Sequence, residues 1–576
     1  MADKQSPYRS QGLTKRQVYE QIRATSWNER STFDPHWRLL GDYIMPRRAR
    51  FLITDRNKGD RRNQNIIDST ATFAARTLRS GMHAGITSPA RPWMKLTTPD
   101  PDLAEFGAVK EWLHVVTQRM LTVFQRSNLY NVLPTVYGDM GVFATAAMGV
   151  FEDDDELFRC YSYPIGSYAF GVSNRQIVDQ FVREWPMTVR QIVYDFGLDK
   201  QTNMIDWTNI SQTVRNMWDR AQYEQTVEVC RVIMPNDYYD PRRPLDKESA
   251  MRFASCTFEK GESREGKFLR ESGYNEFPIL GPRWDVTGED IYGTDCPGMT
   301  SLGDVKQLQV MVKRKSQAVE KMVNPPMTAP TALRNQKASI LPADITYVDV
   351  REGQQGFRPA HEVSLSVADL TADIQDVRMM VRRSFYEDLF LMLAQSDRRE
   401  ITAREIDERH EEKLLALGPV LERTNDELLD PMVDRVYGMM DRAGLIPPPP
   451  EELDNVDLKV EYISLMAQAQ KLVGVVGHER FASFSMQLMQ AFPEVRHKVD
   501  AMQLIDDHGE MLGVDPKVVR PDDEARASAD AERQQQAAMI AAEQAKNMAG
   551  SAKALSETDV SGDNALTALA RGVVPA

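Results

Sequence analysis

A proline break between two amphipathic helices, near the middle of the 576-residue chain, constrains the fold more than any other feature. In residues 299–323, apolar side chains recur at steps of three, four and seven, which places them on one face of a helix. The members of this stripe are Leu302, Val305, Leu308, Val312, Val319 and Met322. Asn324, Pro325 and Pro326 end the helix, because proline lacks an N–H and disfavours helical backbone in the residue before it.

A second helix is predicted over residues 364–391. Ser366, followed three residues later by Asp369, is typical of a helix start. The apolar stripe that follows consists of Leu370, Ile374, Val377, Val381 and Phe385. We expect the two helices to pack antiparallel, joined by a small insertion of β type at 324–363.

A polar loop and a third helix follow this pair. The loop at 392–401 contains Gln395, Ser396, Asp397, Arg398 and Arg399. Thr402 and Glu405 then cap a helix with its own apolar stripe, and Pro419 and Pro431 predict bends within it. Paired helices, a polar loop and a kinked helix are an unusual plan for an enzyme, and they suit the wall of a tube.

The flanking regions complete a fold that we predict to be α+β and mainly helical. Residues 1–146 have helical periodicity, with a first cap at Thr14 and Gln17. Residues 147–298 change to a period of two and predict a mixed α+β domain, with a hairpin around the acidic run 152–156 and a short helix capped by Thr188 and Gln191.

The C-terminal part is predicted to be helical as well. Residues 402–520 include expected helices at 460–476, 480–491 and 498–512. Residues 521–548 are helical by propensity but have a weak apolar stripe. Beyond Gly550 we expect disorder, so 521–576 is either a C-terminal helix or a disordered tail.

Composition limits the environment of the protein. With 42% hydrophobic and 27% charged residues, the chain is typical of soluble globular proteins. No apolar run approaches the roughly 18 residues of a membrane span, and the polar N-terminus has no signal core, so we expect assembly in a cytoplasm. The net charge of −14 argues against a tight clamp on duplex DNA. Four widely spaced cysteines predict free, buried thiols.

Sequence motifs give little support to catalysis. Residues 261–267 match the phosphate-binding pattern G-x-x-x-x-G-K, but Phe268 stands where a Ser or Thr should bind magnesium, so a charged hairpin turn is favoured. The acidic run 152–156 favours a solvated hairpin tip over a cation site. His410 has no second histidine at the spacing of a zinc-binding helix. We therefore assign no catalytic residue, no metal ligand and no cofactor.

A basic cluster lies on the first helix of the pair, on the side opposite its apolar stripe. It consists of Lys306, Lys313, Arg314, Lys315 and Lys321. One interpretation is a solvated or subunit-facing polar surface; the other is transient contact with DNA phosphate. The same two interpretations apply to Arg398 and Arg399 in the polar loop.

An ordered series of segments resembles the portal proteins, or head-to-tail connectors, of short-tailed double-stranded DNA phages. The segments are 68–71 leading to 87–93, the helix end at 323–326, and 400–406 with the long helix and prolines that follow. The order and spacing of these pieces, spanning roughly residues 10–490, carry the resemblance, whereas 521–576 has no recognisable motif.

This resemblance implies a ring of twelve copies at one capsid vertex of the virion. The helices at 299–323 and 364–391 would form a stem around a channel for double-stranded DNA, with the basic cluster in that channel. Residues 324–363 would form the clip, with Asn324, Pro325, Pro326, Arg334 and Lys337 as candidate clip residues. The loop at 392–401 would be the tunnel loop, 1–298 the wing and 402–520 the crown region, and 521–576 could extend into a barrel.

The resemblance also implies partners and leaves alternatives. A terminase motor would dock on the ring and tail adaptor proteins would replace it, with capsid and scaffolding proteins around it and no membrane. The alternatives are another virion structural protein, such as a tail adaptor or an internal ejection protein, and a packaging ATPase or nuclease. An adaptor would be much shorter, an ejection protein would lack the proline break, and Phe268 counts against the ATPase.

Overall fold

A computed structural model describes most of the chain. The described residues are 14–51, 59, 62–100, 103–104, 106–199, 202–237, 239, 251–261, 266–328, 334, 358–359, 366–396, 417–453, 456–463, 481–489, 492, 499, 502–505 and 522–556. They belong to two compact units, one of residues 1–99 with 112–473 and the other of residues 100–111 with 474–576.

Helices dominate the N-terminal region. They are α1 (Lys15–Ser31), α2 (Asp34–Tyr43), α3 (Thr70–Ile86), α5 (Gly107–Arg126) and α6 (Leu129–Phe143). The predicted capping box is confirmed, since the Thr14 hydroxyl accepts from the backbone N–H of Gln17 and the Gln17 side chain accepts from that of Thr14. Small residues let α3 approach α6, as at Gly141, where an added Cβ would lie 2.6 Å from Leu78.

Two antiparallel sheets follow, so the fold is α+β and mainly helical, as predicted. The larger sheet has the order β4-β5-β6-β7-β8, with strands β4 (Tyr168–Val172), β5 (Val178–Thr188), β6 (Thr226–Pro235), β7 (Phe253–Glu259) and β8 (Arg270–Tyr274). The smaller one has the order β3-β2-β9, with β2 (Ala147–Asp153), β3 (Leu157–Tyr163) and β9 (Ile279–Leu280). Tyr19 of α1 packs into the core of the larger sheet.

Local predictions in this region are confirmed. The β2–β3 hairpin turns within the acidic run, with Asp153 paired to Leu157. Thr188 and Gln191 form a capping box at the start of α7 (Val189–Ile192), which continues as a π turn, η2 (Val193–Gly197), before α8 (Gln212–Asp219). All four cysteines are free and buried, and burial raises the pKa of Cys160 and of Cys296 to about 12. Both thiols therefore stay protonated at neutral pH.

The C-terminal half of the larger unit holds one correction. A helix was expected over residues 460–476, but its first residues belong to β12 (Lys459–Tyr462), which pairs antiparallel with β1 (Met94–Thr97). The physical reason is a distant partner: Lys95 pairs with Glu461 at 2.8 Å, and the Trp93 ring stacks on Tyr462 with centroids 6.3 Å apart. Residues 464–480 lie outside the described residues.

Other elements here are η5 (Asn425–Leu429), α13 (Asp430–Arg442) and η6 (Glu451–Leu453). The predicted cap at Thr402 and Glu405 lies outside the described residues, which resume at Leu417.

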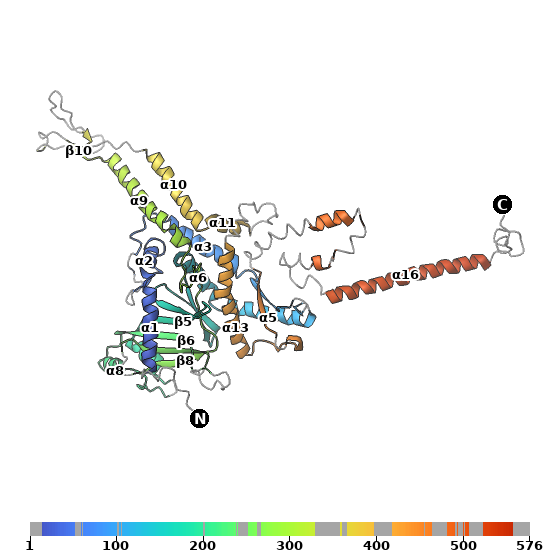
Figure 1. Cartoon of the computed structure of the whole chain (residues 1–576), viewed down its shortest axis with the longest axis horizontal. Coiled ribbons are helices and arrows are strands. Elements are labelled where there is room, and N and C mark those ends of the chain that lie inside the picture. The colour runs from blue at the N-terminus through green and yellow to red at the C-terminus, as the bar shows by residue number, and fades with distance from the viewer. Residues whose placement is uncertain are drawn as a thin grey trace, which may run out of the picture. The chain divides into compact units, whose positions relative to one another are not determined.

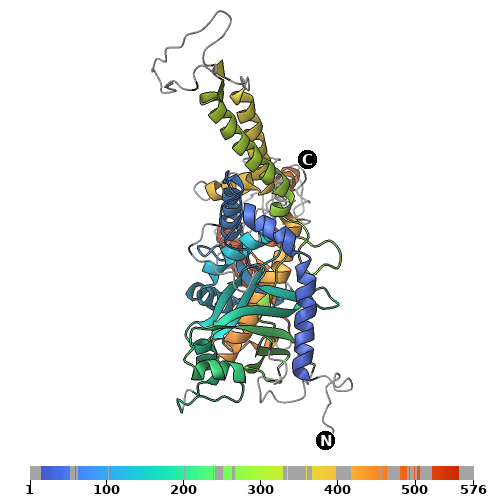
Figure 2. The same cartoon turned by 90° about the vertical axis from the view of Figure 1, so that its left-hand side faces the viewer.

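The proline break separates α9 (Pro297–Val323) from α10 (Val367–Ser384), which is followed by α11 (Glu387–Ser396). The two-residue strands β10 (Met327–Thr328) and β11 (Arg358–Pro359) pair antiparallel between them. Figures 1 and 2 show α9 and α10 side by side, extending away from the sheets, with β10 at their far end. The predicted pair of antiparallel helices is thus present.

The second unit contains α16 (Asp522–Ser556), a helix of 35 residues. It runs past Gly550, where disorder was expected, and its described side chains are almost all exposed. Among the described residues, no helix combines the length and the apolar character needed to cross a membrane.

Candidate functional site

An apolar seam joins α9 and α10. Leu308 of α9 packs with Ile374 and Val377 of α10, and the half-buried Met311 and Val312 flank this cluster. Beside the seam, the Lys315 ammonium donates to the Thr371 hydroxyl at 2.7 Å. The predicted stripes of the two helices therefore meet face to face along this stretch.

The first turn of α9 packs against the body of the larger unit, by which we mean its helices and sheets other than the α9–α10 pair. Gly298 lies so close to α6 that an added Cβ would be 2.5 Å from the carbonyl oxygen of Val142. The Ser301 hydroxyl is fully buried and donates to the Pro297 carbonyl at 2.7 Å. Glycine is required at such a close approach, so the start of α9 is fixed against α6.

A second attachment joins both helices to the start of α3. The side-chain amide of Gln309 accepts from the backbone N–H groups of Ile67 and Asp68, each at 2.7 Å, and donates to the Asp68 carbonyl at 2.9 Å. From α10, Arg378 places two nitrogens 3.0 and 2.7 Å from one carboxylate oxygen of Asp68. We call Gln309, Asp68 and Arg378 the junction triad.

Asp68 also binds the first turn of α3, because its carboxylate accepts from the backbone N–H of Thr70 at 2.9 Å. Burial on its own raises the pKa of Asp68, but the hydrogen bonds from Thr70 and Arg378 outweigh it and hold the pKa below its usual range. The carboxylate is therefore charged at neutral pH and ties α3 to α10.

The second half of α9, residues 311–323, is more exposed than the first half, residues 297–310. We call these two halves the far half and the root of α9. Leu302, Val305 and Leu308 of the predicted stripe are buried, but Val319 and Met322 are 38% and 45% exposed, and Val323 is 80% exposed. Within one chain, α10 therefore covers only the nearer part of the stripe.

The basic residues predicted on α9 lie in different surroundings. Lys313, Arg314 and Lys321 are exposed, whereas Lys306 and Lys315 are half-buried. The Lys306 ammonium lies 5.8 Å from the centre of the Tyr43 ring, and Lys315 binds Thr371. Among the residues that the structure describes, the charges of the first three have no close contact with α10 or with the rest of the larger unit.

The candidate residues around the proline break are partly described. Asn324 ends α9 and donates its backbone N–H to the Glu320 carbonyl at 2.8 Å. Pro326 and Arg334 are exposed and Pro325 is half-buried, while Lys337 lies outside the described residues.

The polar loop predicted at 392–401 is corrected at its start, because residues 392–396 belong to the helix α11. Gln395 and Ser396 belong to the last turn of α11, and nothing is described of their side chains; Asp397, Arg398 and Arg399 lie outside the described residues.

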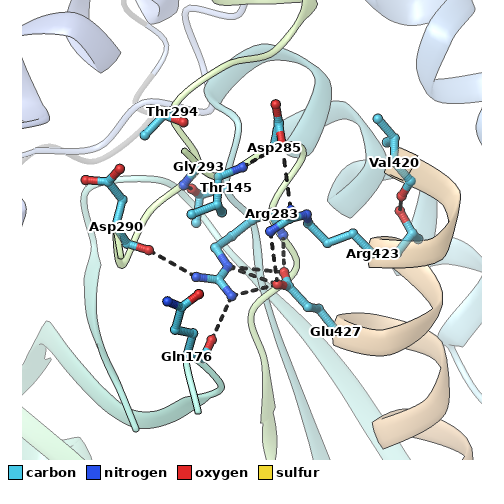
Figure 3. Close-up of polar contacts among 12 residues, drawn as sticks. Thr145, Gln176, Arg283, Asp285, Asp290, Gly293, Thr294, Val420, Arg423 and Glu427 are labelled. Atoms are coloured by element: carbon cyan, nitrogen blue, oxygen red, sulfur yellow. Dashed lines mark hydrogen bonds and ion pairs between the residues drawn. The ribbon is translucent and has the colours of Figure 1, made fainter. Parts of the chain in front are cut away.

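A third attachment was not predicted from sequence (Figure 3). Arg283, which is nearly fully buried, donates from its backbone N–H and its guanidinium to the Glu427 carboxylate, at 2.8 and 2.6 Å for the closest contacts. The same guanidinium donates to the carbonyls of Gln176 and Asp290 at 2.9 and 3.2 Å. Arg423 approaches Asp285 at 3.7 Å from the same helix as Glu427.

The Arg283 site joins three parts of the chain that are distant in sequence: the β4–β5 turn, the segment that leads into α9, and the helix that includes η5. Glu427 lies within the π turn η5, a local widening of the helix that changes the direction of its side chains. Arginine suits this site because its planar fork donates to several acceptors at once. No sequence signal predicts the pair, since 144 residues separate the partners.

The G-x-x-x-x-G-K match does not form a phosphate site in its described part. The Lys267 ammonium donates to the Ile210 carbonyl at 3.1 Å, and Phe268 packs edge-on against Tyr19. Residues 262–265 lie outside the described residues. A phosphate-binding lysine would need its charge directed at a loop followed by a helix, whereas β8 follows here.

Comparison of the sequence with known proteins assigns the chain to a family. A family model described as bacteriophage head to tail connecting protein matches residues 16–519. The portal protein of Salmonella phage epsilon15 is 48% identical over 543 residues, which cover 94% of this chain and 96% of the relative. The probable portal protein of Bordetella phage BPP-1 is 42% identical over 543 residues with the same coverage. This chain therefore belongs to the family of bacteriophage head-to-tail connecting proteins.

Proposed function

We propose that the protein is the portal of a double-stranded DNA phage with a short tail. In this proposal, copies of the chain form a ring at one capsid vertex, and DNA enters during packaging and leaves during ejection through the central hole. The observation that carries it is the α9–α10 pair, which projects from the body and leaves apolar side chains uncovered at its far end. The two portal relatives, matched over almost their whole length, support it.

Ring closure accounts for the uncovered apolar side chains. At the far end of α9 they are Val319, Met322 and Val323; nearer the body, Val310 of α9 and Met379 and Met380 of α10 are exposed as well. A heterologous contact, in which one surface of each copy meets a different surface of the next, closes a ring when the rotation between copies is a simple fraction of a turn. We propose twelve copies.

The parts of the chain take distinct roles in this ring. Residues 1–146 and 147–298 form the wing, 299–323 and 364–391 the stem, 324–363 the clip and 402–520 the crown region. The tunnel loop is 392–401, whose first five residues are the end of α11. Residues 521–576, with α16, are a candidate for a barrel. The terminase motor docks on the clip during packaging, tail adaptors bind there afterwards, and capsid and scaffolding proteins contact the wing during assembly in the host cytoplasm.

Charge suits passage of DNA rather than tight binding. A net charge of −14 on each chain, repeated around a ring, repels phosphate and keeps the duplex from adhering. The exposed Lys313, Arg314 and Lys321 on α9 reduce this repulsion locally. Such a function moves a polymer through a hole, and it needs no catalytic residue or cofactor.

Imaging of the purified full chain tests the proposal. Electron microscopy should show rings with a central hole, and native mass spectrometry should give one ring mass that is a whole multiple of the chain mass. A preparation that stays monomeric at all concentrations, or that hydrolyses ATP, would contradict the proposal and favour a motor or an internal virion protein.

A further inference from the structure

The helix after the proline break is interrupted at a place where its sequence favours continuation. From Ser366 to Ser396 the chain contains no glycine and no proline, and Val381, Phe385 and Leu389 continue one apolar stripe at steps of four. Nevertheless α10 ends at Ser384 and α11 begins at Glu387. Sequence propensity therefore predicts one helix where the structure has two.

The interruption rests on a strained residue. Tyr386 has a φ of 55°, the left-handed region that side chains with a Cβ disfavour. The turn also loses regular helical hydrogen bonds, because the Tyr386 N–H donates to Arg383, three residues back, at 3.1 Å. A straight helix would remove both penalties, so other contacts must hold the bend.

Packing against α3 is the first of these contacts. Phe390 of α11 is nearly fully buried and lies over Gly81, where an added Cβ would come within 2.3 Å of the phenylalanine ring. A glycine in the middle of α3 costs helix stability, and here it provides the space that α11 occupies. Leu389 of α11 is also fully buried.

The placement of charged residues on either side of the break is the second interaction that holds the bend. Arg382 and Arg383 lie in the last turn of α10, and Glu387 and Asp388 lie in the first turn of α11. Basic residues at a helix C-terminus and acidic residues at an N-terminus are stabilised by the helix dipole, and this benefit exists only if the helix is broken between them. Arg382 and Glu387 also approach each other at 3.5 Å across the break.

We propose that the α10–α11 turn is a two-state hinge, in which Tyr386 strain favours a straight helix and the Phe390–Gly81 contact holds the bent one. The state of the hinge sets the direction in which the chain leaves α10. A partner that binds α11 better in one state shifts the hinge by its difference in affinity for the two states.

Spin labels on the assembled full-length protein test the hinge. Cysteines introduced at Ala368 and Leu391, both exposed, would lie about 35 Å apart in a straight helix and closer together in the bent form. Labelled chains diluted with unlabelled ones keep distances between copies out of the measurement. The control pair Ala368 and Met380 lies within α10 and should keep a separation of about 18 Å in every variant.

Variants should move the hinge in opposite directions. Wild type should give the short distance, and Phe390→Ala should shift the equilibrium toward the long distance by at least about a hundredfold. Adding Tyr386→Gly to Phe390→Ala should shift it back about tenfold, because glycine adopts this φ without strain. Adding Tyr386→Ala to Phe390→Ala, which removes the same ring but keeps a Cβ, should leave the long distance in place.

The proposal fails if Phe390→Ala retains only the short distance, or if Tyr386→Ala restores the short distance as well as Tyr386→Gly does. Gly81→Ala is a second test, in case Phe390→Ala fails to fold. It disturbs the same contact from the side of α3, and alanine increases the helix propensity of α3. It should also populate the long distance, and a short distance alone in this variant overturns the hinge.

Discussion

The body of the larger unit and the far half of α9 differ in how their side chains are buried and hydrogen-bonded. In the body, Trp37 is fully buried and donates its indole N–H to the Phe143 carbonyl at 3.0 Å. The nearly buried Arg435 donates to the carbonyls of Val150 and Glu276, both at 2.8 Å. On the far half of α9, Val319, Met322 and Val323 are 38%, 45% and 80% exposed, and most of the charged side chains there are exposed too. The body thus completes its core within one chain, and the far helix does not.

In the proposed ring, this difference would separate what makes the subunit fold from what makes subunits associate. Complete burial of a fully exposed Val or Met side chain contributes roughly 1.5–3 kcal/mol, these partly exposed ones would contribute less, and a ring would repeat the gain at every interface. Substitutions in the body and at the root of the pair should therefore change unfolding, whereas substitutions on the far half should change assembly. The four predictions below test this contrast.

Val381→Asp should have the largest effect on unfolding. Val381 is fully buried in α10, so an aspartate there would be an unpaired charge in an apolar site, and we expect a loss of about 4 kcal/mol in the free energy of unfolding. Val377→Asp, in the seam with Leu308, should behave alike, and neither variant should form rings. Urea unfolding followed by circular dichroism measures the loss. Normal rings from both variants would mean that this face of α10 is not buried in the assembly.

Glu427→Ala should have the second-largest effect, because it leaves the buried Arg283 guanidinium without its counter-charge. We expect a loss of about 3 kcal/mol in the free energy of unfolding. Arg423→Ala is the matched control, since its contacts to Asp285 and Glu427 are long, at 3.7 and 3.9 Å, and it should cost less than about 1 kcal/mol. Equal losses in the two variants would show that the Arg283–Glu427 pair does not hold this region together.

Contacts close in sequence could be predicted, and contacts between distant segments could not. The apolar period gave α9 and α10, and Ser366 accepts from the Asp369 N–H as its cap pattern predicted. The junction triad joins residues about 240 and 310 positions apart, and nothing near Gln309 indicates that its amide will bind the backbone of Asp68. The strand at 459–462 was missed for the same reason, because its pairing partner is β1.

Apolar periodicity also does not indicate which part of a helix's apolar stripe will be buried by other parts of the same chain. Leu308 and Met322 occupy equivalent positions in the α9 pattern, yet only Leu308 is buried. The difference arises from where α10 begins: Lys315 contacts Thr371, only four residues after the first residue of α10, so the antiparallel partner helix ends before it reaches the level of Met322. The Tyr386 turn was likewise invisible, because no glycine or proline marks it.

Asp68→Asn should have a smaller effect that depends on pH. The carboxylate has a lowered pKa in the folded protein, so its contribution is present above the unfolded pKa of about 3.9 and is lost as the pH falls through the lower folded value. At pH 7 we expect the variant to lose about 1.5 kcal/mol in the free energy of unfolding. Urea titrations from pH 7 down to pH 3 should show that the difference in the free energy of unfolding between wild type and variant disappears only at the acid end. A difference that is constant over this range would mean that the charge of Asp68 does not contribute.

Met322→Asp should have the smallest effect on the subunit and a large one on the ring. Met322 is exposed in the single chain, so its replacement should change the free energy of unfolding by less than about 0.5 kcal/mol. In a ring, the same aspartate would be buried against the next copy without a partner, and native mass spectrometry should show loss of the ring mass. Gln317→Asp is the matched control, because it adds the same charge at an exposed polar position of α9 and should leave rings intact. If both variants assemble normally, the far half of α9 faces solvent in the ring, and the contrast with the body concerns channel lining rather than contact between copies.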